Sequence, residues 1–139
     1  MVVFKKRKAI HFPKDIVEVM VRILNREDEI DRKKEHFWTV GLDSKNCIVY
    51  IELVSLGTLT TSIVHPRETF RLAIMKGVAR LMMIHNHPSG DSSPSKNDID
   101  LTKKMVKAGK ILGIEVVDHI IITEREDKFF SFKEHKMLD

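Results

Sequence analysis

One stretch decides how this chain folds and what it can bind: ARLMMIHNHPSGDSSPSKND, residues 79–98. It begins with a mostly apolar run, Ala79 to Ile84, which is typical of a buried β-strand. Two histidines, His85 and His87, follow at the end of that strand. Because residues two apart on a strand point to the same face, both imidazoles can be directed at one point.

The residues after the histidines bring a carboxylate back toward them. Proline and glycine force a loop over residues 88–94. Ser95 then opens a helix, and Asp98 falls in its first turn. Two neutral imidazole nitrogens and one carboxylate oxygen, with a fourth position open, are the donor set of a catalytic zinc site. We therefore expect Zn2+ to be the cofactor, bound by His85, His87 and Asp98.

Two simpler interpretations explain parts of this pattern. Ser95 and Asp98 have the spacing of a capping box, which stabilises the start of a helix without any metal. A histidine pair at a strand end is often no more than a polar end to the strand. The complete string His-x-His-x7-Ser-x2-Asp is harder to obtain from capping and turns alone, which favours the metal site.

This string resembles the zinc signature of the JAMM/MPN metalloproteases, and the longer sequence around it is similar to that of the bacterial RadC family. Three further phrases match RadC proteins: Glu-His-Phe at 35–37, Val-His-Pro-Arg-Glu at 64–68, and the run from Ile114 to Ile122. The resemblance extends from about Ile10 to the C-terminus. It implies the JAMM/MPN fold, which is similar to that of cytidine deaminases.

Periodicity and turn residues predict the remaining elements independently. The expected order is a helix from Pro13, a charged connector over 25–34, strands over 35–42 and 47–54, a loop at 55–58, a strand over 59–64, a helix over 66–76, the histidine strand, a helix from Ser95 to Gly113, strands over 114–123 and 128–131, and a terminal helix over 132–138. This order predicts an α/β fold with a mixed central β-sheet flanked by helices. Within the helix after Ser95, the residues expected to face inward are Ile99, Thr102, Val106, Gly109 and Leu112.

The length of 139 residues fits one compact unit by size. We divide it into a basic N-terminal arm and helix, residues 1–34, and a JAMM/MPN-like RadC domain, residues 35–139. The helix from Pro13 packs on the domain or on a partner, and it is the candidate surface for a homo-oligomer. RadC proteins usually begin with a helix-hairpin-helix segment associated with DNA binding. This sequence has no room for that segment: it is either a piece of a longer protein or a short member of the family. We do not expect these residues to carry the DNA-related role that the segment supports.

The net charge of +4 is concentrated in the arm. Residues 1–34 contain ten Lys/Arg and six Asp/Glu, whereas residues 35–139 contain fourteen of each. DNA affinity depends mainly on neutralising phosphates, so we expect weak DNA binding confined to the run Lys5–Lys8. A peptide or protein substrate is the expected partner.

Hydropathy and cysteine content exclude other classes. No apolar run approaches the roughly 20 residues that span a bilayer, and no signal-peptide hydrophobic region follows the N-terminal charges. We therefore expect a cytoplasmic protein without a membrane partner. A single cysteine, Cys47, excludes a disulfide framework and the Pro-Cys-x-x-Cys motif of zinc nucleobase deaminases.

A zinc ion with three protein ligands keeps a water in its fourth position and lowers the pKa of that water to about 7. The chemistry then needs a general base. The JAMM resemblance implies that this base is Glu35, with Glu52 and Glu68 as competitors, and that Ser95 donates to the oxyanion of the reaction. The expected function is therefore a zinc-dependent hydrolase that cleaves a peptide or isopeptide bond.

The alternative is a RadC-type interaction module associated with DNA repair and without protease activity. MPN-type domains that only scaffold usually lack some of the ligands that this chain has, which favours the hydrolase. Four other polar residues in the family-like phrases receive non-catalytic interpretations. His65 and His119 could line a substrate groove but are expected to be structural, and Asn86 and Ser89 are expected to shape the loop.

Overall fold

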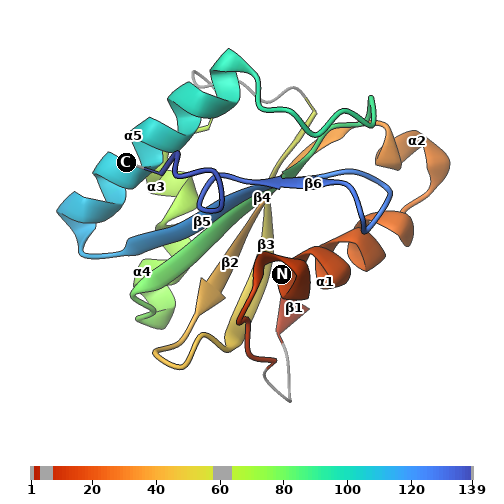
Figure 1. The fold of residues 1–139 in the computed structure, drawn as a ribbon. Helices are drawn as coiled ribbons and strands as arrows, with labels where there is room; N and C mark the ends of the chain where they lie inside the picture. Colours follow the sequence, from red (N-terminus) through yellow and green to blue (C-terminus); the bar gives the residue numbers. More distant parts are fainter. Residues whose placement is uncertain (1, 4–7, 58–63, 139) are drawn as a thin grey trace.

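A single β-sheet runs through the structure, a computed structural model that describes residues 2–3, 8–57 and 64–138 (Figure 1). Across the described residues the strand order is β1-β3-β2-β4-β5-β6. The strands are β1 (Val2–Val3), β2 (Glu35–Leu42), β3 (Ile48–Gly57), β4 (Arg80–Asn86), β5 (Glu115–Ile122) and β6 (Phe129–Ser131). Strands β4 and β5 run parallel and the other neighbours antiparallel, so the sheet is mixed.

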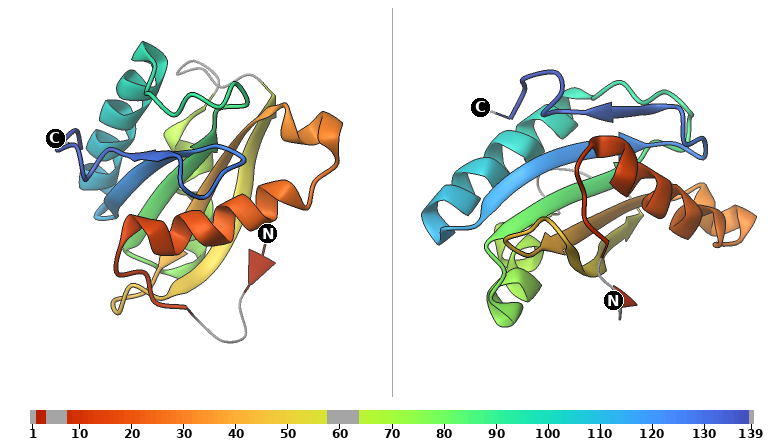
Figure 2. Two further views of the ribbon diagram at one scale, coloured as in Figure 1. Left: turned by 45° about the vertical axis from the view of Figure 1, so that its right-hand side comes forward. Right: turned by 60° about the horizontal axis from the view of Figure 1, so that its bottom comes forward.

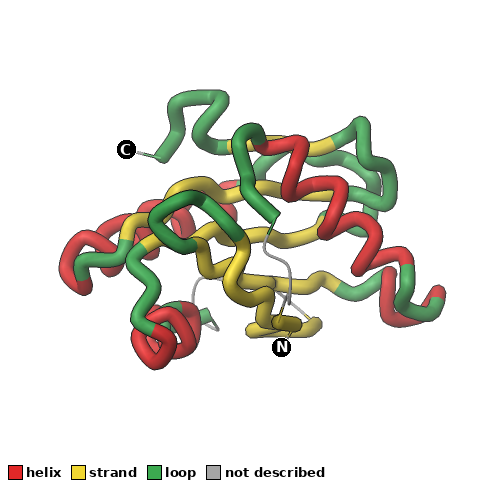
Figure 3. The backbone as a smooth tube through the Cα atoms, turned by 90° about the horizontal axis from the view of Figure 1, so that it is seen from below, coloured by secondary structure: helices red, strands yellow, loops and turns green. Residues whose placement is uncertain are grey.

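Helices cover both faces of this sheet (Figures 2 and 3). Helix α1 (Pro13–Asn25) packs on one face, and a short helix, α2 (Glu29–Arg32), follows it. The other face carries α3 (Pro66–Thr69), α4 (Arg71–Lys76) and α5 (Lys96–Leu112). A mixed sheet between two helical layers confirms the predicted α/β fold.

A hydrophobic core lies on each face of the sheet, and successive side chains of β4 point alternately into one and the other. Leu81 and Met83 are buried with the residues of α5, whereas Met82 and Ile84 are buried with those of α1. Because side chains alternate along a strand, His85 continues the α5 side. The same alternation that builds both cores therefore directs the first histidine at the helix that carries Asp98.

Helix α5 begins with the predicted capping box. The Asp98 amide donates to Ser95 Oγ over 3.1 Å, and the Asp98 carboxylate accepts from the Ser95 amide over 2.8 Å. Its buried stripe differs from the predicted one and consists of Asp98, Leu101, Thr102, Met105 and Gly109. The buried stripe begins at Asp98, one residue before Ile99, which is the first apolar residue of the helix. Leu112 therefore lies outside the stripe and is exposed.

Two predicted helices are wrong in detail. The helix expected over 66–76 is two short helices, α3 and α4, that meet at Phe70, where the backbone has φ −98° and ψ −4°. The terminal helix expected over 132–138 is a series of turns. There Lys136 has a positive φ of 56°, and the Met137 amide donates to the Phe132 carbonyl over 2.8 Å. A left-handed residue interrupts helical hydrogen bonding, which explains the turns.

Strand β3 is longer than predicted. The sequence predicts a loop from Ser55, but β3 continues to Gly57 because its pairing with β2 extends until Glu35 lies opposite Gly57. The short helix α2 forms inside the predicted connector, with Asp28 accepting from the Asp31 amide as its N-cap. The strand expected over 59–64 lies, except for Val64, outside the described residues.

The apolar face of α1 is buried against its own sheet. Ile16, Val17 and Met20 are fully buried in one cluster with Trp38 and Val40 of β2. Contact with a second copy would therefore have to use another face of this helix. Among the described residues, no helix is long and apolar enough to cross a membrane.

A substitution at Gly109 tests the packing of α5 on the turn into β5. A Cβ atom at this position would lie 2.3 Å from the carbonyl oxygen of Ile114, and backbone cannot move aside as a flexible side chain can. We expect Gly109→Ala to lower the free energy of unfolding by about 1–3 kcal/mol, measured by chemical denaturation. Lys110→Ala, at the exposed neighbour, should change it by less than about 0.5 kcal/mol. Equal effects of both variants would contradict this packing.

Candidate metal centre

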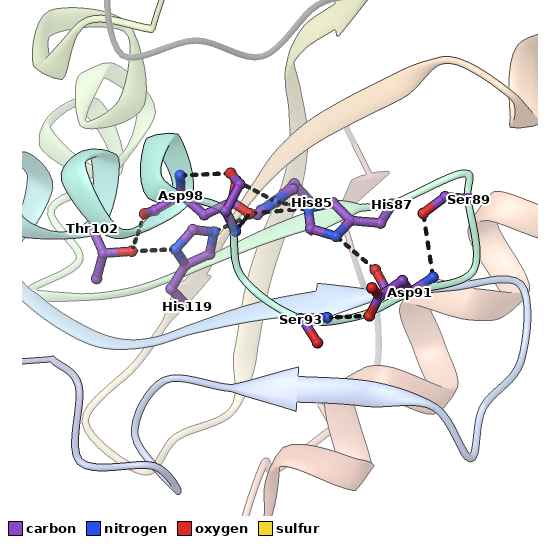
Figure 4. Close-up of polar contacts among 9 residues, drawn as sticks. His85, His87, Ser89, Asp91, Ser93, Asp98, Thr102 and His119 are labelled. Atoms are coloured by element: carbon purple, nitrogen blue, oxygen red, sulfur yellow. Dashed lines mark hydrogen bonds and ion pairs between the residues drawn. The ribbon is translucent and has the colours of Figure 1, made fainter.

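Three predicted ligands converge where β4 ends and α5 begins (Figure 4). Nε2 of His85 lies 2.9 Å from Asp98 Oδ1, and Nε2 of His87 lies 3.0 Å from Asp98 Oδ2. The two Nε2 atoms are 3.1 Å apart. One donor atom from each residue lies within 4.8 Å of the others, so the three side chains form a group that could hold a metal ion.

The cluster is buried on its inner side and reaches solvent on its loop side. His85 is fully buried and Asp98 is 4% exposed, whereas His87 is half-buried and Ser95 is exposed. Such a site is closed to solvent at its base and stays accessible at its mouth. Both properties are needed if a small ligand or a substrate is to reach a bound ion.

Burial and mutual contact shift the protonation of the cluster. Burial alone would raise the pKa of the Asp98 carboxyl, but the imidazoles of His85 and His87, which face its two oxygens, outweigh burial and hold that pKa well below its usual range. Burial alone would lower the pKa of His87, yet its hydrogen bonds to Asp98 and to the Asp91 carbonyl raise it. The carboxylate is therefore ionised, and it favours a positive charge beside it.

The donor set fits a divalent ion such as zinc. Nδ1 of His87 lies 2.8 Å from the carbonyl oxygen of Asp91. A carbonyl oxygen can only accept a hydrogen bond, so Nδ1 carries the proton of the neutral ring. Nε2 then has a free lone pair. A lone pair on His87 Nε2, 3.1 Å from the Nε2 of His85 and beside an anionic carboxylate, calls for a proton or a cation between these atoms. Two imidazole nitrogens and one carboxylate are ligands that zinc accepts.

The side chain of Asn86 joins β4 to the start of β2. The β2–β4 ladder ends with Phe37 opposite His85. Beyond it, Asn86 Oδ1 accepts from the His36 amide over 2.6 Å, and Asn86 Nδ2 donates to the Lys34 carbonyl over 3.0 Å. This Asn86 bridge therefore holds the peptide groups on both sides of Glu35, rather than shaping the loop as the sequence predicts.

Glu35 is the half-buried first residue of β2. Its negative charge acts to raise the pKa of His87, in addition to the stronger effects of burial, Asp98 and Asp91. The competing glutamates are engaged or directed elsewhere. The Glu52 carboxylate lies 3.0 Å from the Arg71 guanidinium on α4, and Glu68 is exposed in the first turn of α3.

Two residues that the sequence analysis did not assign to the site contact the cluster. His119 on β5 lies with Nε2 2.7 Å from Nδ1 of His85, and its own Nδ1 lies 2.5 Å from Thr102 Oγ1 on α5. Both residues are fully buried. Thr102 follows Asp98 by one helical turn, which is the spacing that could have revealed it. His65 precedes α3 as its N-cap residue without a side-chain capping bond.

The structure is an α/β domain with a mixed sheet, in which a central strand ends in two histidines that face an aspartate of the next helix, and these three residues could hold a metal ion. The model of the RadC-like JAB domain matches residues 10–137, and this chain belongs to that family.

Curated relatives agree with this assignment. The UPF0758 protein Mbar_A2303 of Methanosarcina barkeri is 50% identical over 129 residues, which cover 93% of this chain and 53% of the relative. The UPF0758 protein of Desulforamulus reducens is 45% identical over 127 residues, which cover 91% and 53%. The UPF0758 protein TTE0897 of Caldanaerobacter subterraneus subsp. tengcongensis is 47% identical over 131 residues, which cover 90% and 54%. The chain thus spans about half the length of the curated relatives it matches.

Asp98→Asn tests the carboxylate as a ligand. The amide keeps the size of the side chain and an oxygen for the helix cap, but it removes the charge that faces both histidines. We expect zinc affinity, measured by competition with a chelator, to fall at least about 100-fold, because the loss of an outer-shell partner alone already costs 10–100-fold. The matched control is Asp100→Asn, at an exposed position on the same helix. Wild-type zinc affinity in Asp98→Asn would remove Asp98 from the ligand set.

The pH dependence of zinc stabilisation follows from His87. Its pKa in the folded protein lies above the ordinary value of about 6.5. Its protonated form therefore stabilises the metal-free protein at low pH, and this contribution is lost as the pH rises through the raised pKa. Zinc needs the unprotonated ring, so its binding strengthens over the same range. The rise in melting temperature on adding zinc should grow between about pH 5.5 and 8. A constant rise would contradict zinc ligation by His87.

Proposed function

We propose that this chain is a zinc-dependent hydrolase of the JAMM type that cleaves a peptide or isopeptide bond. The observation that carries the proposal is the convergence of His85, His87 and Asp98 beside the head of β2, where Glu35 lies. The proposed residues lie at the end of β4 and in the loop that follows it, at the start of α5 and at the start of β2, and β2 pairs with β4 as far as Phe37 opposite His85.

His85, His87 and Asp98 would hold the ion. When bound, it supplies a Lewis acid that lowers the pKa of a water molecule and polarises a substrate carbonyl. The chain contributes the fixed orientation of the ligands. His87 is oriented by the Asp91 carbonyl, and Asp98 by the Ser95 amide.

Glu35 is the proposed general base. A base must sit close to the water whose proton it accepts, and it must be held there. The Asn86 bridge orients the peptide groups before and after Glu35. A second support is His36, whose Nε2 lies 2.5 Å from Glu27 Oε2 while its ring stacks on Trp38. The charge of Glu35 also acts on His87, which supports its assignment over Glu52 and Glu68.

Ser95 is the proposed donor to the oxyanion that develops on the substrate carbonyl. Its oxygen accepts from the Asp98 amide as a helix cap. A hydroxyl can accept and donate at the same time, so this contact leaves its proton for a substrate. The exposure of Ser95 beside the buried carboxylate gives a substrate access to that proton.

The proposed partner is a peptide or protein rather than nucleic acid. Residues 35–139 are formally neutral, with equal numbers of basic and acidic side chains. Nucleic-acid affinity depends mainly on phosphate neutralisation, and a balanced surface supplies little of it. A peptide needs no such excess of positive charge, because hydrogen bonds and apolar contacts can hold it in place.

Glu35→Gln separates catalysis from metal binding. The amide keeps the shape of the side chain but cannot accept the proton, so we expect turnover to fall roughly 10²–10⁴-fold while zinc affinity stays unchanged. Turnover is measured on an unbiased peptide library with zinc-loaded protein, with cleavage sites identified by mass spectrometry.

The matched control is Glu68→Gln, at an exposed glutamate on α3 that should retain full activity. A zinc-loaded wild type that cleaves no member of peptide and isopeptide libraries would contradict the proposed hydrolase. Full activity in Glu35→Gln would instead move the base to another residue.

A further inference from the structure

A chain of three hydrogen-bonded side chains leads away from the buried side of the metal centre (Figure 4). Nδ1 of His85 lies 2.7 Å from Nε2 of His119, and Nδ1 of His119 lies 2.5 Å from Thr102 Oγ1. The chain ends at the helix that carries Asp98, because Thr102 Oγ1 lies 2.8 Å from the Asp98 carbonyl oxygen. We call these three residues, His85, His119 and Thr102, the buried relay.

The direction of each hydrogen bond in the relay follows from the end at Asp98. A carbonyl oxygen carries no proton, so the single hydroxyl proton of Thr102 points to it. The hydroxyl oxygen must then accept from His119, which places a proton on His119 Nδ1. The neutral His119 ring has no proton on Nε2, so this atom accepts from Nδ1–H of His85. With its proton on Nδ1, the His85 ring has an unprotonated Nε2, and this is the nitrogen that faces the cluster.

The surroundings of His119 favour the neutral ring that this direction requires. The ring is fully buried and stacks on Phe132, with centroids 4.7 Å apart and planes 7° from parallel. Its two nitrogens are both engaged by the relay, by one histidine and one hydroxyl. A charged ring would be costly at a buried site without a carboxylate partner.

We propose that Thr102 is a positioning residue that determines, through His119, which ring nitrogen of His85 carries the proton. The inference rests on the proposed metal site, because an imidazole binds a metal through its unprotonated nitrogen. Thr102 touches neither the ion nor a substrate. It presents His85 to the ion in the tautomer that can bind.

Removal of the Thr102 hydroxyl lets the direction of the hydrogen bond between His119 and His85 reverse. In Thr102→Val a proton on Nδ1 of His119 has no acceptor, and a buried N–H without a partner carries its full desolvation cost. The His119 proton then moves to Nε2 and donates to His85 Nδ1. His85 in turn is protonated on Nε2, where it can donate to Asp98 Oδ1, 2.9 Å away. A metal must undo this arrangement before it binds.

The test combines the tautomer of His119 with zinc affinity in the full chain. Heteronuclear NMR of the histidine rings in metal-free protein at mildly alkaline pH reports which nitrogen is protonated. We expect the proton on Nδ1 of His119 in the wild type and in Thr102→Ser, and on Nε2 in Thr102→Val. Zinc affinity by chelator competition should fall about 10–100-fold in Thr102→Val and return close to wild type in Thr102→Ser.

Thr69→Val is the matched control. Thr69 is a buried threonine at the end of α3, and its hydroxyl has no hydrogen-bond partner among the residues that the structure describes. This variant makes the same chemical change outside the relay and should keep the wild-type tautomer and zinc affinity. Unfolding curves of all variants show whether each remains folded.

Two results would overturn the inference: Nδ1 protonation of His119 in a folded Thr102→Val, or zinc affinity in that variant equal to that of Thr69→Val. Neither measurement involves hydrolysis. A protein that shows the expected tautomers and affinities but cleaves nothing therefore sustains the relay and contradicts only the proposed hydrolase.

Discussion

The Asp98 carboxylate is the group on which both the local fold and the metal centre depend. One of its oxygens accepts from the Ser95 amide and also faces His87, while the other faces His85. The capping box and the metal site are alternative interpretations of the sequence, but in the structure they are the same side chain. The carboxylate can serve as the acceptor of the helix cap and still offer an oxygen to a cation, because it has two oxygens and several lone pairs.

Three consecutive residues at the end of β4 have two different roles. His85 and His87 face α5 and supply ring nitrogens, while Asn86 between them reaches across to β2. Strand alternation makes this division possible, since neighbouring side chains point to opposite faces. As a result the proposed base and the proposed ligands are positioned by one short segment, and a shift in the β2–β4 register would displace both.

The metal centre has a closed side and an open side with different chemistry. On the closed side, His119 and Thr102 are fully buried and control only hydrogen-bond direction. On the open side, the half-buried His87 and the exposed Ser95 meet solvent, where a substrate can approach. This asymmetry is consistent with a site that keeps its ligands rigid while it exchanges molecules at one mouth.

The sequence by itself determined the features that depend on short spacing. The i, i+2 histidines, the Ser95–Asp98 cap and the apolar periods that form β4 and α5 are set within one or two turns of chain, so they predict the α/β class and the ligand group. Tertiary structure alone decided the Asn86 bridge, which spans 50 residues to His36, and the relay from His85 to His119, which spans 34. It also set the buried phase of α5 and the turns after Phe132. These features depend on which strands become neighbours and in what register, and no local propensity encodes that choice.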